Sequence, residues 1–271
     1  MNYRIINHSS YTFLLKNVVK IYELTTSNEE CYYRTIPNGI IGFSLKLKGK
    51  SWFFENEKWH VIPKSTINGL TQKPLLIKES KDCREISFGF NPLFLSLFLK
   101  HPMHLVSDKT TDLREIMNVH IVEELEENLF FAKDDNTILS CIEKFLLQTL
   151  CRTVDFQLLE AYNCILTNQT TKVERLAQYL NVSTRTLLNR FKDQVGLSPK
   201  DLMKIHRINN SLNIKLHNPE NLTDLAYKLG YFDQSHFIHD FKGTIGISPE
   251  KYFTNNLLIS DFYNLDRWSV V

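Results

Sequence analysis

The spacing of hydrophobic residues along the chain changes near residue 92. Before that point the apolar runs are short, and residues 41–47 alternate with Phe43, Leu45 and Leu47 on one side. This period of two predicts a half-buried strand. After that point apolar residues recur every three or four positions, which predicts amphipathic helices. The sequence therefore predicts an α+β protein in which a β-rich part precedes a helical part.

The first 90 residues contain further short runs typical of strands. These runs lie at 51–54, 59–62, 75–78 and 86–90, and residues 55–58 are expected to form a hairpin loop. The prolines in this region fall between the runs, where a sheet tolerates them. The pattern predicts a small antiparallel β-sheet or a cupin-like barrel.

Barrels of this kind can hold a ligand. Five aromatic residues are candidates to line an effector pocket: Trp52, Phe54, Trp59, Phe88 and Phe90. The alternative is that these rings fill the hydrophobic core. A metal-binding cupin needs a cluster of histidine and carboxylate ligands. His60 stands nearly alone, and Pro102 interrupts the pair His101 and His104, so no metal is expected.

Helical spacing continues from residue 93 to residue 166, where helices are expected at 93–100, 113–117, 121–130, 138–150 and 156–166. Asp112 is expected to cap the second of these helices, with Glu115 at the capping-box position. In the third helix the apolar stripe is Ile121, Leu125, Leu129 and Phe130, and the opposite faces carry Glu123, Glu124, Glu126 and Glu127. Such helices pack on their own sheet or pair with a second protomer, and the sequence leaves both outcomes open.

One pattern occurs twice between residues 173 and 253. The first copy covers 173–199 and the second covers 222–249. Matching positions are offset by 49 residues early in the pattern and by 50 residues later: Leu176-Ala177 with Leu225-Ala226, Phe191-Lys192 with Phe241-Lys242, Gly196 with Gly246, and Ser198-Pro199 with Ser248-Pro249. A repeat of this kind indicates one supersecondary unit used twice.

Each copy has the residues that a helix, a tight turn and a second helix require. Asn181 and Gly230 tolerate the left-handed conformation that such a turn needs. Ser183 and Asp233 are expected to cap the second helices, at 183–194 and 233–243. The helix over 199–217 joins the two copies. The sequence therefore predicts two helix-turn-helix units.

Charge is unevenly divided along the chain. Residues 1–164 hold 19 Lys and Arg against 20 Asp and Glu, whereas residues 165–253 hold 12 against 8. The repeat region is thus the basic part of the protein. This excess favours a polyanionic partner, although an accidental imbalance of this size is equally common.

Composition indicates a globular protein, with 43% hydrophobic and 23% charged residues. The five cysteines form no CxxC pair, which favours free thiols in a reducing compartment over a zinc site or a disulfide framework. The N-terminus lacks the apolar segment of a signal peptide, and no apolar run has the length of a membrane span. A cytoplasmic protein without cofactor is expected.

The doubled pattern, its joining helix and the segment 241–249 closely resemble the AraC/XylS family of bacterial transcription regulators. The resemblance covers about 172–253 and includes both G-x-S-P endings. It implies that the second helix of each unit enters the major groove, with the two helices about one DNA turn apart. It also implies that the β-rich part is a sensor or dimerisation domain.

The outward positions of the two second helices are the candidates for contact with bases. They are Thr184, Arg185, Leu188 and Asn189 in the first unit, and Gln234, Ser235, Ile238 and His239 in the second. Arg185 suits a guanine edge and Asn189 an adenine edge. Family members often have arginine at the position of His239, so the first unit is expected to contribute more specificity. The candidates for phosphate contact are Ser183, Arg190, Lys192, Asp233 and Lys242.

Three parts are expected: a β-rich sensor or dimerisation domain at 1–168 with a helical connector at 112–166, a DNA-binding domain at 169–255, and a tail at 256–271. The expected function is a sequence-specific, effector-responsive transcription regulator and not an enzyme. Its candidate partners are double-stranded DNA, a small-molecule effector, RNA polymerase and a second copy of the chain. The alternatives are a DNA-binding module fused to an enzyme or a metal-binding cupin domain, and a DNA-bending protein without a sensor.

Overall fold

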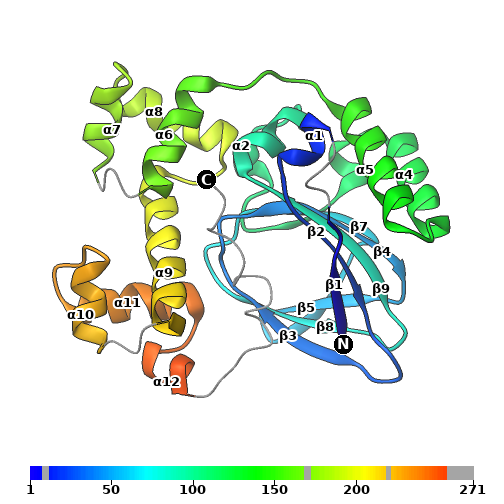
Figure 1. Ribbon diagram of the computed structural model, residues 1–271, viewed down its shortest axis with the longest axis horizontal. Coiled ribbons are helices and arrows are strands. Elements are labelled where there is room, and N and C mark those ends of the chain that lie inside the picture. The colour runs from blue at the N-terminus through cyan, green and yellow to red at the C-terminus, as the bar shows by residue number, and fades with distance from the viewer. Residues whose placement is uncertain (8–11, 168–171, 218–220, 255–271) are drawn as a thin grey trace.

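The N-terminal part of the protein consists of two antiparallel sheets, seen in the computed structural model, which describes residues 1–7, 12–167, 172–217 and 221–254 (Figure 1). The strands are β1 (Asn2–Ile5), β2 (Val18–Thr25), β3 (Cys31–Thr35), β4 (Ile41–Lys48), β5 (Ser51–Glu55), β6 (Lys58–Ile62), β7 (Ser65–Asn68), β8 (Leu75–Glu79), β9 (Arg84–Phe90) and β10 (Thr110–Asp112). The first sheet has the order β1-β2-β9-β4-β7-β10, and the second has the order β3-β8-β5-β6. The predicted antiparallel β-rich part is therefore confirmed.

The expected barrel does not close, because no described strand pair joins the two sheets. The β5–β6 hairpin shows the physical reason. Its turn residues Asn56 and Glu57 both have positive φ angles, 49° and 63°, which gives the tight hairpin that follows the twist of its strands. β6 is exposed along most of its length, so it has no apolar face to bury against the first sheet.

The helices follow the sheets along the chain. Before the repeat region they are α1 (Phe13–Lys16), α2 (Pro92–Leu95), η1 (Ser96–Phe98), η2 (Met103–Leu105), α3 (Leu113–Ile116), α4 (Val119–Phe131), α5 (Asp135–Thr149) and α6 (Phe156–Leu166). The antiparallel pair α4 and α5 packs beside the first sheet (Figure 1). Phe145 of α5 lies edge-on to Phe43 of β4, with ring centroids 5.4 Å apart, so these two elements share one core.

The buried face of α4 differs from the predicted one. Val122, Leu125 and Leu129 are buried, whereas Phe130 is 55% exposed. Glu126, expected on a polar face, is buried instead. Its carboxylate accepts hydrogen bonds from Lys64 Nζ (2.7 Å), Ser65 Oγ (2.6 Å) and Arg114 Nη2 (2.6 Å). The helix is rotated toward its glutamate because these three donors compensate for the loss of water around the carboxylate.

The repeat region is all helical, as predicted. Its helices are α7 (Val173–Tyr179), α8 (Thr184–Gln194), α9 (Pro199–His217), α10 (Leu222–Lys228), α11 (Gln234–Ile245) and α12 (Pro249–Thr254). α6 packs on α9, so this helix lies with the C-terminal helices and apart from the sheets (Figure 1). The expected domain boundary near residue 168 and the tail at 256–271 lie outside the described residues. The boundary near residue 168 therefore stays a prediction.

Candidate nucleic-acid interface

The first helix-turn-helix unit is formed by α7 and α8. Asn181 in the turn has a φ of 52°, the left-handed conformation that its type tolerates. Ser183 Oγ accepts a hydrogen bond from the backbone N–H of Thr186 at 3.0 Å, so Ser183 is the N-cap of α8. Leu187 and Phe191 are fully buried. The predicted cap, turn and buried pair are confirmed.

The face of α8 opposite that buried pair is open to solvent. The four side chains predicted to contact bases in this unit, Thr184, Arg185, Leu188 and Asn189, are all exposed. Arg185 makes no ion pair with any described residue. Its guanidinium is therefore available to an external acceptor.

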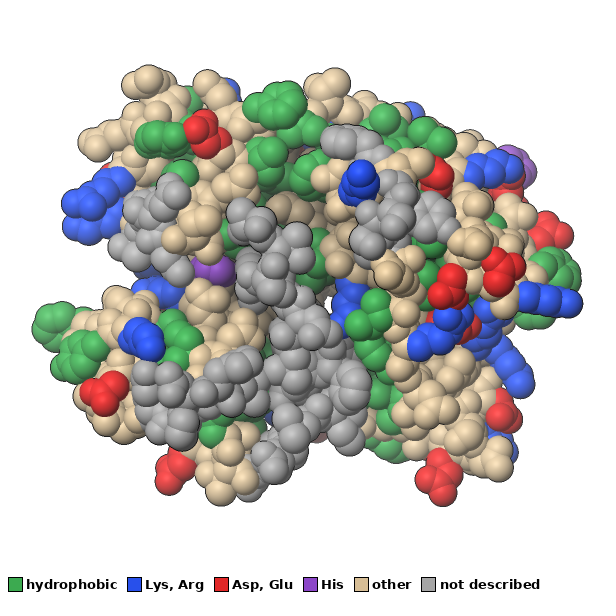
Figure 2. Space-filling view, viewed as in Figure 1, with side chains coloured by type: hydrophobic (Ala, Val, Ile, Leu, Met, Phe, Trp, Pro, Cys, Tyr) green, Lys and Arg blue, Asp and Glu red, His purple; other side chains and the backbone are tan. Residues whose placement is uncertain are grey.

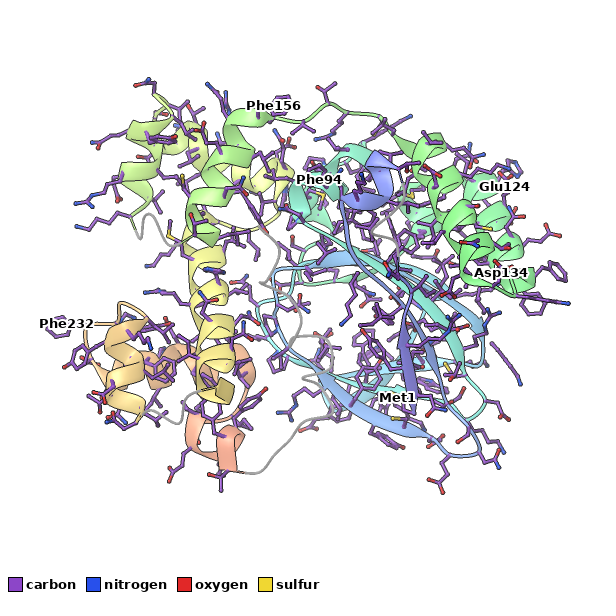
Figure 3. All side chains as sticks on the ribbon, viewed as in Figure 1. Met1, Phe94, Glu124, Asp134, Phe156 and Phe232 are labelled. Atoms are coloured by element: carbon purple, nitrogen blue, oxygen red, sulfur yellow. The ribbon has the colours of Figure 1, made fainter. Side chains whose placement is uncertain are left out.

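The second unit, α10 and α11, repeats this geometry. Gly230 in the turn has a φ of 77°, and Asp233 Oδ1 accepts from the backbone N–H of His236 at 2.7 Å. Phe237 and Phe241 are fully buried. Figure 3 shows Phe232, next to the cap, pointing away from the module, and this ring is 86% exposed. Sequence reasoning missed Phe232 because an aromatic ring in a short turn resembles a core residue.

The base-contact candidates of the second unit are not all exposed, whereas those of the first unit are. Ser235 and His239 are exposed. Gln234 Oε1 accepts a hydrogen bond from Thr223 Oγ1 at 2.9 Å, and Ile238 packs against the second core. Contact of Gln234 with a base therefore requires this bond to be broken or shared.

The five candidates for phosphate contact fall into three groups. Ser183 and Asp233 lie at helix N-termini as caps. Lys192 and Lys242 are exposed in the last turns of α8 and α11. Arg190 is held within the protein, since its Nη1 donates to Gln157 Oε1 at 3.0 Å and lies 3.9 Å from Asp155 Oδ2. Basic side chains border the indentation between the two helical lobes in Figure 2.

α9 sets the separation of the two units. It has 19 residues and is therefore about 28 Å long, at 1.5 Å per residue. One helical turn of DNA is about 34 Å, so helices held near the two ends of α9 suit successive major grooves. Ser198 begins α9 by capping it, with Asp201 N–H donating to Ser198 Oγ at 3.2 Å. The fold and this site define a bipartite helix-turn-helix module.

Comparison with known proteins agrees with this class. Residues 176–255 match the family model described as a helix-turn-helix domain. The transcriptional activator RhaS of Citrobacter koseri is 33% identical over 76 residues, which are 28% of this chain and 27% of that protein. The transcriptional regulator MtrA of Neisseria gonorrhoeae is 29% identical over 80 residues, 30% of this chain and 27% of that protein. The chain thus matches about a quarter of the length of these relatives, and the similarity is confined to the helix-turn-helix region.

Among solved structures, ToxT from Vibrio cholerae O395 covers 88% of this chain and 96% of its own, with 15% identity and a TM-score of 0.47. ToxT from another strain of Vibrio cholerae has been solved with an unsaturated fatty acid bound, and it matches with 14% identity and a TM-score of 0.42.

A cavity of about 180 Å³ lies in the β-rich part, between residues of the two sheets. Its wall includes Tyr22, Tyr33, Ser44, Thr66, Asn68 and Ser87, together with Phe88. Thr66 Oγ1 is buried there and has no hydrogen-bond partner among the described residues. The cavity therefore offers hydroxyl and amide groups to a small polar molecule.

Only Phe88 of the five predicted pocket aromatics lines this cavity. Phe90 is buried in the core of the first sheet, and its ring lies edge-on to that of Phe43. Trp52, Phe54 and Trp59 belong to the β5–β6 hairpin, where Phe54 and Trp59 are exposed and pack on each other. The open outer hairpin explains this difference, because it keeps these rings at the surface.

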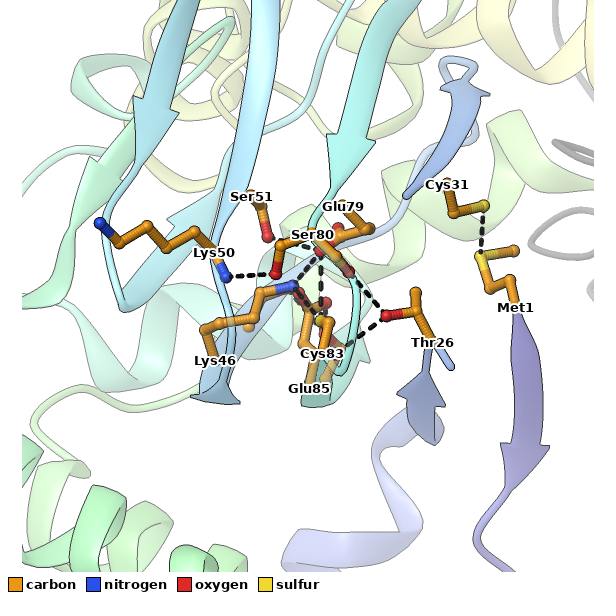
Figure 4. Close-up of polar contacts among 12 residues, drawn as sticks. Met1, Thr26, Cys31, Lys46, Lys50, Ser51, Glu79, Ser80, Cys83 and Glu85 are labelled. Carbon is orange, nitrogen blue, oxygen red and sulfur yellow. Dashed lines mark hydrogen bonds and ion pairs between the residues drawn. The ribbon is translucent and has the colours of Figure 1, made fainter. Parts of the chain in front are cut away.

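A buried polar network, drawn in Figure 4, includes Glu79 and Glu85, which also line the cavity. Lys46 Nζ donates to Glu79 Oε2 at 2.6 Å and also pairs with Glu85. Burial opposes the charge of Lys46, but the two carboxylates outweigh it and raise the pKa of this lysine. Burial also raises the pKa of the neighbouring Cys83 thiol to about 12, so this cysteine is protonated and a poor nucleophile.

The alternation of residues in β4 did not predict this buried network. Ser44 and Lys46 alternate with the predicted apolar side of β4, so they lie on the other face of the half-buried strand that was predicted there. The second sheet covers that side too, so Lys46 is buried. A group of three histidine, cysteine or acidic side chains suitable for a metal ion is absent from the described residues. Within the same residues, every helix is too short or too polar to cross a bilayer.

One segment of the β-rich part lies against the DNA-binding module. Ile36, directly after β3, is 4% exposed and belongs to the hydrophobic core of the second unit, with Ile208 and Phe237. Asn209 Nδ2 of α9 donates to the carbonyl oxygen of Pro37 at 3.0 Å. Ile36 and Asn38 also line the cavity, so this segment touches the cavity and the module at once.

Proposed function

We propose that this protein is a sequence-specific DNA-binding transcription regulator that acts in the cytoplasm. One observation carries the proposal: two helices with caps and exposed outer faces, α8 and α11, lie near opposite ends of α9. Each presents side chains that can contact base edges in a major groove. The family-model match over residues 176–255 and the 33% identity with the transcriptional activator RhaS over 76 residues support it.

The two units contribute unequally to this proposed recognition. Arg185 and Asn189 are exposed, and Arg185 makes no ion pair with a described residue. Arginine and asparagine are side-chain types that can form two hydrogen bonds with one base edge. Gln234 is bonded to Thr223, and Ile238 is half-buried. The first unit therefore accounts for most of the sequence specificity.

Selection of bound sequences from a random DNA pool by the full chain tests the proposal. The expected result is an enriched motif with two elements about one helical turn apart, of which the element bound by α8 has the higher information content. A pool that shows no enrichment over competitor DNA would overturn the proposed function, and enrichment by deformability alone would favour a DNA-bending protein.

The regulator is proposed to respond to a small polar effector bound in the cavity between the sheets. Unpartnered Thr66 Oγ1 inside the cavity and the contact of Ile36 with both cavity and module support this proposal. A ligand changes DNA binding only if it favours one state of the protein over another. Movement of residues 36–38 on ligand binding supplies such a difference.

A thermal-shift screen of small polar molecules on the full chain tests the effector site. Ser44→Phe should fill the cavity and abolish any stabilisation by a hit, whereas Ser140→Phe on the exposed face of α5 should leave it unchanged. Equal stabilisation of both variants would place the ligand elsewhere.

The same proposal includes contact with RNA polymerase, pairing of two copies and the absence of enzymatic activity. The exposed rings of Phe130 and Phe131 at the end of α4 support pairing through the helical connector. The protonated state of Cys83 argues against cysteine chemistry in the β-rich part.

A further inference from the structure

Three basic side chains lie on one face of α9, the helix that joins the two units. Lys200, Lys204 and Arg207 are spaced by four and three residues, which places them in one row along a helix. The row is about 10 Å long, at 1.5 Å per residue. It lines a hollow between α9 and α11, whose other wall contains His236, His239 and Asp240.

The three cations of the row outnumber the two carboxylates in the same hollow. Lys200, Lys204 and Arg207 make no ion pair with a described residue. Of the two carboxylates in the hollow, Asp201 accepts a hydrogen bond from Ser198 Oγ at 2.6 Å, and Asp240 lies 3.8 Å from His236. Apart from its two histidines, the hollow holds three basic and two acidic side chains.

Five of the basic side chains in the β-rich part and its connector differ in this respect. There Lys46, Lys64, Arg84, Arg114 and Lys144 are each paired with a glutamate. Cations left unpaired along one helix face are costly in mutual repulsion unless an anion meets them. The row on α9 therefore has the character of a surface for an external polyanion.

Arg207 gives a second and independent observation. Its Cζ lies 4.5 Å from the ring centroid of Tyr231, so the guanidinium is held against an aromatic face. Its Nε is buried and has no hydrogen-bond partner among the described residues. A buried donor without a partner is unfavourable, and an incoming acceptor removes this cost.

The position of the hollow indicates which polyanion meets it. His239 lines the hollow and also lies on the outer face of α11, where bases are contacted in the proposed function. α8 precedes the start of α9, so the row lies along the stretch of chain that separates the two recognition helices. DNA bound by both helices brings the backbone between its two elements toward this row.

We propose that Lys200, Lys204 and Arg207 form a third DNA contact, which binds phosphates of the spacer between the two elements. This inference rests on the proposed function, and it adds a sequence-independent contact to the two base-contacting helices. Each phosphate neutralised by a cation releases bound counterions, so the row contributes to the salt dependence of binding. Discrimination between DNA sequences does not depend on it.

The test compares binding of the full chain to its selected DNA at several salt concentrations. In the triple variant K200Q/K204Q/R207Q the slope of log K against log salt should fall in magnitude by about 2 to 3, at about 0.9 per phosphate. Affinity for selected and competitor DNA should fall by the same factor. The control K58Q/K100Q/K133Q removes the same charge from exposed positions of the β-rich part and the connector, and its slope should stay unchanged.

A second arm uses wild-type protein and DNA with neutral methylphosphonates in the spacer. These should reduce the salt slope of the wild type as the triple variant does, and they should have little further effect on that variant. If the triple variant does not fold, the salt slopes of the single variant K204Q and of the wild type with methylphosphonate DNA still test the proposed contact.

An unchanged slope in the variants, or an equal change in the control, would overturn the inference while the selected motif keeps the proposed function intact. Absence of any DNA binding by the wild type would overturn both. Inhibition by inorganic phosphate beyond that of chloride at equal ionic strength, with an unchanged slope, would make the row a site for a free anion.

Discussion

Arg185 and Arg190 lie on the same helix but differ in their contacts with the rest of the protein. Arg185 is exposed in the first turn of α8, whereas Arg190 is bonded to Gln157 and lies close to Asp155 on the α6 side. A guanidinium that already has a carboxylate and an amide partner gains less from a phosphate or a base. At the scale of the residue, the contacts of a basic side chain within the protein thus indicate whether it is available to bind DNA.

Arg185→Ala should weaken binding to the selected DNA by about 1–3 kcal/mol and relax the preference at one base pair. The physical reason is the loss of a bidentate contact with a guanine edge. Binding isotherms with the selected sequence and its single-base variants measure both effects. Arg190→Ala is the matched control and should leave the base preference intact; a preference that survives in Arg185→Ala contradicts the assignment.

Cys83 should resist alkylation in the native protein. With a pKa of about 12, about one thiol in ten thousand is ionised at pH 8, and the side chain is buried. Mass spectrometry after iodoacetamide treatment should therefore find Cys151, which is exposed, modified long before Cys83. In denaturant the two should react at similar rates. Fast labelling of native Cys83 would show that the buried network opens readily.

How far the sequence predicts single residues depends on the distance to their partners. The caps Ser183 and Asp233 were predictable because each bonds a backbone N–H three residues away. Glu126 was not, because its partners include Lys64 and Ser65, about sixty positions earlier. Spacing along a helix describes which positions share a face, and it does not say that a distant strand supplies donors for a carboxylate.

At the scale of the element, α9 combines a basic row that is at least partly exposed with a buried opposite side. His206 lies on that buried side, and it is 3% exposed. Burial lowers its pKa to about 4, and a hydrogen bond with the backbone of Leu166 only partly opposes this. The neutral imidazole is therefore the form that the packing of α9 against α6 requires.

Acid should destabilise the protein through His206. Because the folded pKa lies below the ordinary value of 6.5, the unfolded chain takes up this proton first as the pH falls. The stabilisation is complete above about pH 6.5 and is lost between about 6.5 and 4, to a total of about 3 kcal/mol. Urea unfolding at several pH values measures it.

His206→Gln isolates this effect from that of the carboxylates, because glutamine does not titrate. The variant should lose less stability than the wild type between pH 6.5 and 4. Parallel curves for the two proteins across that range would show that His206 is accessible to water and protons in the folded state.

Elements with a regular spacing of apolar residues were predicted, whereas elements without one were not. The alternation in β4 gave its position, and helical spacing gave α4, α5 and α7–α11 within a few residues. β2 and β7 were not predicted. In β2 neighbouring residues are buried as well as alternate ones, so no alternation is visible, and β7 has only four residues. A strand packed on both sides has no polar face, so its period disappears.

At the scale of the whole molecule, the β-rich part is packed against both halves of the DNA-binding module. Ile36 enters the core of the second unit. At the first unit, Gly196 after α8 abuts Met103 and Ser107, where an added Cβ would lie 2.2 Å from Ser107 Oγ. These contacts could not be predicted, because the residues that make them are far apart in sequence and follow no period.

Ile36→Ala should destabilise the second unit by about 2–5 kcal/mol, the usual cost of a cavity in a well-packed core. Hydrogen exchange should show faster exchange in α10 and α11, while the strands keep their protection. Ile5→Ala, at a half-exposed position in β1, is the control and should change neither. Uniformly faster exchange throughout the chain would mean that the two parts unfold as one unit.

The insertion of Ile36 into the second core also bears on how this protein can be divided. A fragment that starts at residue 172 would keep both helix-turn-helix units and lose Ile36, as well as α6 with its packing against α9. It would carry newly uncovered apolar surface on both halves, and such surface promotes aggregation. A cut before residue 172 would thus separate parts that are packed together, and a usable fragment would need replacements for the contacts of Ile36 and of α6.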